Sequence, residues 1–141
     1  MITSARNVFA GTVANIDRGA VNAEITIMLK GETPITSIIT SKSVDTLGLK
    51  EGSVAYAIIK SSSIIICQEL HDARLSARNI MPGIIRKVID GAVSTEVDIE
   101  IAGGNIISSV ITKGSSEKLS LNEGDHACAA FKASSVILGV N

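Results

Sequence analysis

The chain has 141 residues, of which 45% are hydrophobic and only 2% aromatic, and its formal net charge is −1. Thirteen basic against fourteen acidic residues give no bulk attraction for nucleic acid, and one Tyr, two Phe and no Trp leave few rings for base stacking. No apolar run approaches about 18 residues and no charged-then-apolar leader opens the chain, so we expect a soluble cytoplasmic protein with no nucleic acid and no membrane among its partners.

A repeat organises the chain. The tetrapeptide Ser-Ala-Arg-Asn occurs at residues 4–7 and again at residues 76–79, so an offset of 72 residues relates the two copies. Under this offset the matched pairs include Gly11 with Gly83, Gly19 with Gly91, Glu24 with Glu96, Ile35 with Ile107, Thr40 with Thr112 and Lys60 with Lys132. A chance match would not keep register through glycines, polar residues and apolar residues alike. We therefore predict a duplicated module, with a first domain at residues 1–70 and a second at residues 73–141.

The first module predicts five short strands and one helix. In chain order these are strands at residues 7–17, 21–30 and 35–40, a helix at 41–49, and strands at 54–59 and 64–67. The strand at 21–30 alternates well between apolar and polar residues, as a half-buried strand does. The period changes to three or four residues after Ser41, which can cap a helix, and Gly48 suits a left-handed exit from it.

The second module repeats this order. We expect strands near residues 79–89, 93–101 and 106–112, a helix near 115–121, and strands at 126–131 and 136–140. Five short strands with one helix predict an all-β fold of two tandem OB-like, five-stranded Greek-key barrels, with a half-open sandwich as the alternative. A module of this size is marginal alone, and the short charged connector at residues 68–75 indicates that the two modules lie close together.

Few residues suggest catalysis or a cation site. The two histidines, His71 and His126, have no partner at the equivalent position of the other module. Cys67 and Cys128 do not match under the offset either, so we interpret them as small buried hydrophobic residues in a reducing compartment. No Gly-rich phosphate loop and no paired-carboxylate spacing appears. We therefore expect no catalytic residue, no bound metal cation and no enzyme activity.

Hydroxyl and cationic side chains recur in both copies. They are Ser4, Arg6, Thr40, Ser43, Lys60 and Ser62 in the first copy, and Ser76, Arg78, Thr112, Ser115, Lys132 and Ser134 in the second. This set contains hydrogen-bond donors and no carboxylate, as a site for an acceptor-only tetrahedral oxyanion requires. An alternative is that Arg6 and Lys60 protect strand edges from pairing, and spacing alone leaves both interpretations open. Glu24 and Glu96 also recur, and we expect them on a solvated face or paired with a cation.

Four motifs carry a resemblance to a known family. They are Ser-Ala-Arg-Asn, then Ile-Thr-Ser-Ile-Ile-Thr before a Ser-Val-x-x-Leu-Gly-Leu helix, then Glu-Gly, and finally Ile-Lys-Ser-Ser. Together they closely resemble the Mop, or molybdenum-pterin-binding, module, a molybdate-binding relative of the TOBE domain. Two such modules in tandem are similar to the ModG-type molbindins, or di-Mop proteins. The resemblance implies a cytoplasmic homotrimer that binds several molybdate or tungstate ions for storage or homeostasis, with no organic cofactor.

The resemblance also implies the binding residues. By position, the first anion pocket uses Ser4, the Ala5 amide, Arg6, Thr40, Ser43, Lys60 and Ser61. The second set is Ser76, Ala77, Arg78, Thr112, Ser115, Lys132 and Ala133, where Ala133 replaces the hydroxyl of Ser61. A second class of site, near the threefold axis, is placed at Gly19, Ala20, Val21 and Asn22 and at Gly91, Ala92, Val93 and Ser94. In the family, the parts of a pocket come from different modules that meet at an interface.

An alternative function is a regulatory module that presents a molybdate-sensing surface to a protein partner. The same module occurs fused to DNA-binding and transporter ATPase domains, although these 141 residues leave no room for a helix-turn-helix or a Walker loop.

Overall fold

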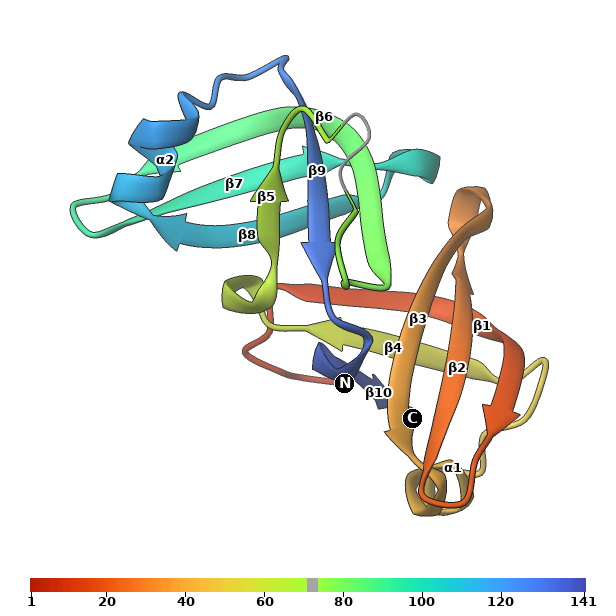
Figure 1. Cartoon of the computed structure of the whole chain (residues 1–141). Coiled ribbons are helices and arrows are strands. Elements are labelled where there is room, and N and C mark those ends of the chain that lie inside the picture. Colours follow the sequence, from red (N-terminus) through yellow and green to blue (C-terminus); the bar gives the residue numbers. More distant parts are fainter. Residues whose placement is uncertain (71–73) are drawn as a thin grey trace.

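The computed structural model describes residues 1–70 and 74–141, so His71 and the predicted start of the second domain at residue 73 lie outside the described residues. Within these ranges the fold is all-β, with two five-stranded sheets and one seven-residue helix for each (Figure 1). No helix in the described ranges has both the length and the apolar character needed to cross a membrane.

The elements follow the order that the repeat predicts. The first half contains β1 (Asn7–Arg18), β2 (Asn22–Leu29), the 3-10 turn η1 (Lys30–Glu32), β3 (Thr33–Thr40), α1 (Ser41–Leu47), β4 (Val54–Ile59), η2 (Ser61–Ser63) and β5 (Ile65–Cys67). The second half contains β6 (Asn79–Asp90), β7 (Ser94–Glu100), η3 (Ala102–Gly104), β8 (Ile106–Thr112), α2 (Lys113–Leu119), β9 (His126–Phe131), η4 (Ala133–Ser135) and β10 (Val136–Gly139).

Local sequence explains how the short helix begins and ends. Thr40, not the expected Ser41, caps α1, because its Oγ1 accepts a hydrogen bond from the Ser43 N–H at 3.0 Å. Gly48 ends the helix in the left-handed conformation, as predicted, with φ +62°. In the second half Thr112 caps α2 in the same way, so that helix starts at residue 113 rather than near 115.

The last strand of each repeat joins the sheet of the other repeat. The strand orders are β10-β4-β1-β2-β3 in one sheet and β5-β9-β6-β7-β8 in the other (Figure 1). Each sheet closes into a barrel against the exchanged segment: Ser37 Oγ donates to the Val136 carbonyl and Ser109 Oγ to the Ile64 carbonyl, both at 2.8 Å. The sheets therefore follow the sequence repeats except at their final strands.

Two buried asparagines join the halves reciprocally. Asn7 Nδ2 donates to the Ser108 carbonyl at 2.8 Å, and the Ser108 N–H donates to Asn7 Oδ1 at 2.7 Å. Asn79 makes the same pair of bonds with Thr36, both at 2.8 Å. Because each amide satisfies an N–H and a C=O that the neighbouring strand would otherwise bury unpaired, these contacts hold the two sheets in one relative position.

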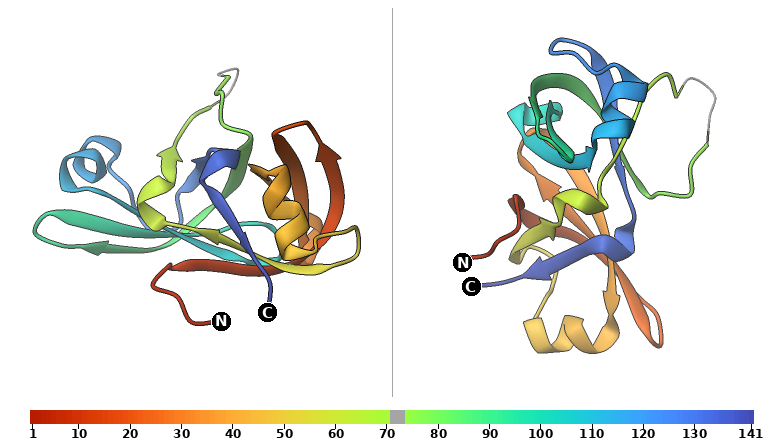
Figure 2. Two further views of the ribbon diagram at one scale, coloured as in Figure 1. Left: turned by 90° about the horizontal axis from the view of Figure 1, so that it is seen from below. Right: turned by 90° about the vertical axis from the view of Figure 1, so that its left-hand side faces the viewer.

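The turns η1 and η3 pack directly on each other. Gly31 and Gly103 have φ values of +72° and +75°, and a Cβ added to Gly103 would lie 2.4 Å from the Lys30 carbonyl oxygen. Asn105 Nδ2 donates to that same carbonyl at 3.2 Å. With the two helices at opposite ends of the molecule, the halves meet along their middle, as Figure 2 shows together with the neighbouring chain termini.

We predict that Gly103→Ala destabilises the chain more than Gly104→Ala does. Both residues have left-handed backbone, with φ +75° and +72°, so both variants incur about 1–2 kcal/mol of backbone strain. A Cβ at Gly104 meets nothing within 4 Å, whereas one at Gly103 overlaps η1 and adds about 1–3 kcal/mol. Urea denaturation measures the two free energies of unfolding. Equal losses in the two variants would show that the halves do not approach this closely.

Candidate functional site

Strand pairing brings the N-terminal segment beside the turn after β4. Asn7 lies opposite Ile59 in the β1–β4 ladder. The residues before β1, Ser4, Ala5 and Arg6, therefore lie at the same end of the sheet as Lys60 and Ser61. In the second half Asn79 lies opposite Phe131, which places Ser76, Ala77 and Arg78 beside Lys132 and Ala133. The structure therefore brings together these predicted site residues in each copy.

Thr40 and Ser43 lie at the other end of the same sheet. Arg18, the last residue of β1, is opposite Ala23, and Thr40 is opposite Asn22 in the neighbouring ladder. The length of β1, twelve residues, therefore separates the start of α1 from the Lys60 turn. The Thr40 and Ser43 hydroxyl oxygens are 2.8 Å apart. Within one sheet, the predicted set is divided into two clusters.

Strand exchange places hydroxyls from both repeats around one pocket. It has a volume of about 430 Å³ and is lined by Ser62, Ile64, Ile65, Ile66, Val110, Ile111, Thr112, Ser115 and Leu119. The first repeat supplies Ser62, Ile64, Ile65 and Ile66, and the second repeat supplies the others. Thr112 and Ser115, hydrogen-bonded to each other at 2.9 Å, thus approach the η2 turn of the other repeat rather than the turn of their own.

Each predicted binding arginine forms an ion pair across the boundary between the halves. Arg6 contacts Glu96 Oε1 on β7. Arg78 donates one hydrogen bond from each of its two terminal guanidinium nitrogens to the Glu24 carboxylate on β2, one of them at 3.0 Å. Of the two alternatives for Glu24 and Glu96, pairing with a cation is the one observed. The donor set therefore gains a carboxylate in each copy, which the sequence interpretation did not include.

The bidentate contact changes the acidity of both partners. The hydrogen bond from Arg78 lowers the pKa of Glu24 below its ordinary value of 4.5, with a smaller contribution from the positive charge of the guanidinium. The same bond raises the pKa of Arg78. The Glu24 and Arg78 side chains are 33% and 52% exposed, so solvent screens their attraction.

Lys60 and Lys132 are the lysines that lie beside the predicted binding arginines and take part in no ion pair among the described residues. Both are exposed at the starts of the η2 and η4 turns. Among the described residues, no carboxylate oxygen lies within the 4.0 Å ion-pair distance of either ammonium group. The next residue differs between the copies, because Ser61 is half-buried whereas Ala133 is buried and has no hydroxyl. Each of these two turns therefore exposes a lysine without a carboxylate partner among the described residues.

The proposed second class of residues forms the two hairpin turns. The N–H groups of Gly19 and Gly91 donate to the carbonyls of Asn22 and Ser94, at 2.8 and 2.9 Å. Their central valines, Val21 and Val93, are 73% and 80% exposed, and their carbonyls accept from the first residue of α1 and of α2. Ala20 and Ala92 lie beside these valines and are exposed too.

The first hairpin turn borders a pocket of about 340 Å³. Its lining residues are Asp17, Arg18, Gly19, Asn22, Ala23, Glu24 and Ile38. Arg18 is already occupied, donating to the Ser41 carbonyl at 3.0 Å and pairing with Asp45 at 2.9 Å. Two carboxylates in the lining oppose anion binding, so this pocket is less suited to an oxyanion than the lysine turns are.

Sequence reasoning missed the polar residues that join the halves. Asn7, Asn79, Ser37 and Ser109 are at most 4% exposed, and each hydrogen-bonds to the other repeat. The sequence does contain a sign of this contact, because these polar residues occur as matched pairs at the 72-residue offset inside otherwise apolar strands. Buried polar residues that recur in this way indicate an interface between the copies.

The Glu24–Arg78 pair predicts a specific pH dependence. A carboxyl group whose pKa is lowered in the folded state stabilises the fold above its unfolded pKa, and this contribution is lost as the pH falls through the lowered pKa. We therefore expect wild type to exceed Glu24→Gln in free energy of unfolding above the ordinary pKa of 4.5, with the difference shrinking as the pH falls below it. Urea titrations from pH 7 to 3 measure it. Glu51→Gln, in an exposed turn, is the control; an identical pH profile for both variants would contradict the prediction.

Comparison with known proteins places both repeats in one family. The model of the TOBE domain matches residues 3–66 and again residues 75–138. These ranges include most of β5 in the first copy and most of β10 in the second, so the family unit corresponds to the sequence repeat and not to the sheet with its exchanged strand.

Similar proteins include a solved structure of the cytoplasmic molybdate-binding protein ModG with molybdate bound, which is 41% identical, has a TM-score of 0.95 and covers 100% of both chains. The chain is also 40% identical to the molybdenum transport protein ModE of Azotobacter vinelandii, over 99% of this chain and 52% of that protein. The molybdenum-pterin-binding protein MopA of Rhodobacter capsulatus is 38% identical over 99% of this chain and 53% of its own length. The chain thus spans about half the length of these two relatives. It belongs to the TOBE domain family, as a tandem, ModG-type member with two TOBE domains.

Proposed function

We propose that the chain is a cytoplasmic molybdate-binding protein that holds the bare oxyanion, tungstate as well as molybdate, for molybdenum storage and homeostasis. The observation that carries this proposal is the full-length similarity to ModG, whose structure contains bound molybdate. In this proposal no reaction is catalysed and no organic cofactor takes part. The molecule acts by binding alone, and its sites are the cationic turns at the boundary between the two halves.

Lys60 and Lys132 are proposed as the primary charge partners of the ion. Molybdate is a dianion at neutral pH, and its oxygen atoms only accept hydrogen bonds. Charge-assisted hydrogen bonds are worth about 1.5–3 kcal/mol each, so an ammonium group together with nearby hydroxyls accounts for useful affinity. Ser4 and Ser61 lie at the same end of the sheet as Lys60 and are proposed as neutral hydrogen-bond donors. Arg6 and Arg78 are held there by their carboxylate partners.

A second copy of the chain is proposed to complete each site. Thr40 and Ser43 are a sheet length away from Lys60 in the same module, and the helix-start hydroxyls beside the η2 turn are Thr112 and Ser115 of the other repeat. Ile65 on β5 and Ile137 on β10, which match under the repeat, are both 63% exposed, and such apolar side chains favour self-association. A homotrimer with several ions is the proposed assembly, with the turns at residues 19–22 and 91–94 forming a second class of site.

The alternative is a molybdate-responsive module that regulates a protein partner. The observation that favours it is the similarity to ModE proteins, of which those of Yersinia pestis and Escherichia coli are described as transcriptional regulators. Affinity capture from a cell extract, with and without molybdate, separates the two roles. A partner retained only in one ligand state supports regulation, whereas ion uptake without a partner supports storage.

We predict that Lys60→Ala weakens molybdate binding at one class of site by about tenfold to a hundredfold, the equivalent of one charge-assisted hydrogen bond. Isothermal titration calorimetry at fixed ionic strength measures the dissociation constant. Lys50→Ala removes the same charge from an exposed turn between α1 and β4 and is the matched control, with affinity expected within about twofold of wild type. No molybdate uptake by wild type would refute the proposed function, and equal affinities in the two variants would refute the role of Lys60.

A further inference from the structure

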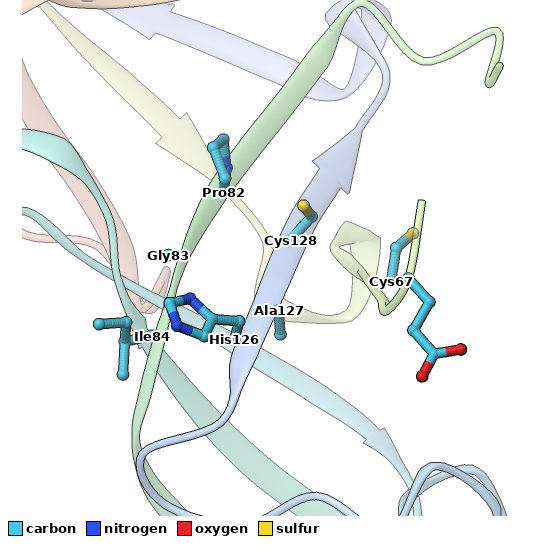
Figure 3. A pocket seen from close by; sticks show the side chains of 8 residues that line it. Cys67, Pro82, Gly83, Ile84, His126, Ala127 and Cys128 are labelled. Atoms are coloured by element: carbon cyan, nitrogen blue, oxygen red, sulfur yellow. The ribbon is translucent and has the colours of Figure 1, made fainter. Parts of the chain in front are cut away.

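The two cysteines of the chain face each other across neighbouring strands. Cys67 on β5 lies directly opposite Cys128 on β9 in an antiparallel ladder, although 61 residues separate them in sequence. Both are half-buried, not buried as expected from the sequence, and both line a pocket of about 340 Å³ together with His126 and Pro82. Figure 3 shows the two side chains on adjacent strands beside this pocket.

Strand exchange is the reason that these cysteines meet. The same positions in the other sheet are Gly139, on the exchanged β10, and Tyr56, on β4, which also lie opposite each other. A comparison of the two repeats pairs Cys67 with Gly139 and Cys128 with Tyr56, so it gives no sign of a cysteine pair. The contact exists because β5 leaves its own sheet and joins the second one.

The backbone geometry suits a covalent bond. Directly opposed residues of antiparallel strands have Cα atoms about 4.5–5.5 Å apart, and disulfides join Cα atoms about 4.4–6.8 Å apart. A metal site is less well supported, because the described residues contain no group of three His, Cys, Asp or Glu side chains that could hold an ion.

We propose that Cys67 and Cys128 are an oxidation site, where a small-molecule disulfide such as oxidised glutathione produces a cross-strand disulfide that links β5 to β9. One thiolate attacks the oxidant, forms a mixed disulfide and releases one thiol. The second cysteine then attacks the protein sulfur of that intermediate and releases a second thiol. The two cysteines together lose two electrons and two protons, and the oxidant is reduced to two thiols.

The bond would secure the shortest strand of the second sheet. β5 is a three-residue edge strand paired with β9, and it is also the segment through which the first repeat completes the second barrel. A disulfide there closes a loop of about 60 residues and restricts the unfolded chain, so it raises the midpoint of thermal unfolding. Separation of β5 from β9 then requires reduction of the bond.

Both cysteines exchange slowly with disulfides at neutral pH. Burial raises the pKa of both cysteines, and the charge of Cys128 raises that of Cys67 further. The thiolate is the attacking form, so a raised pKa slows exchange near pH 7 without preventing it. Among the described residues, His126 and Glu69 are the other titratable groups that line this pocket. This environment fits a pair that responds to sustained oxidising conditions.

The experiment treats the reduced full-length chain with oxidised glutathione and measures its intact mass. Formation of the bond removes the mass of two hydrogen atoms, links the peptides that contain residues 67 and 128, and raises the thermal midpoint by about 5 °C or more. Cys67→Ser and Cys128→Ser are the controls, because each keeps one thiol and can form no internal bond. Two persistent thiols, a stable glutathione adduct or chain-to-chain disulfides in wild type would each overturn the proposal. None of these readouts depends on molybdate.

Discussion

Two buried asparagine side chains define how the two repeats fit together. Each presents a carboxamide to the backbone of one strand in the opposite half, and each therefore replaces the partner that this strand lacks at its edge. An unpaired buried amide or peptide group costs about 1–3 kcal/mol, so neither Asn7 nor Asn79 tolerates a displaced partner. The same relative position of the two sheets is maintained by the exchanged strands β5 and β10 and by the close approach of η1 to η3. Two domains that would be marginal separately thus share one packed body.

This arrangement determines the electrostatics of the boundary. Each arginine of the repeated tetrapeptide extends over a strand of the other half and meets a glutamate there, so guanidinium and carboxylate charges largely cancel. The lysines at the η2 and η4 turns have no such partner among the described residues, and we propose them as the charge partners of an anion. The hydroxyls at each helix start lie at the far end of their own sheet, and Thr112 and Ser115 line a pocket with Ser62 of the other repeat. Binding and self-association are therefore linked in the proposed function, because ligand held between copies stabilises the assembly by mass action.

Local patterns in the sequence predict much of the fold. The strands at residues 54–59 and 126–131 have the predicted bounds, since short apolar runs between polar turns admit few alternatives. Gly48 ends its helix as expected, whereas Thr40 replaces Ser41 as the cap because both residues are chemically capable. Strand exchange was not predictable in this way: Ile64 and Val136 are equivalent in the repeat, so either closing segment satisfies the hydrophobic pattern of either barrel. For the same reason the glutamate partners and the facing cysteines emerge only from the three-dimensional arrangement.

In the proposed function, reciprocal contacts between the exchanged repeats leave Lys60 and Lys132 without a carboxylate partner among the described residues, and a tetrahedral dianion binds at these lysines. Diffraction from a molybdate-soaked crystal, recorded at the molybdenum absorption edge, tests this directly, because anomalous scattering locates each ion while the same map shows the path of β5 and β10. We predict anomalous peaks within hydrogen-bond distance of the Lys60 and Lys132 ammonium groups, with β10 paired to β4. Ions bound only away from these lysines, or closing strands that return to their own sheets, would contradict it.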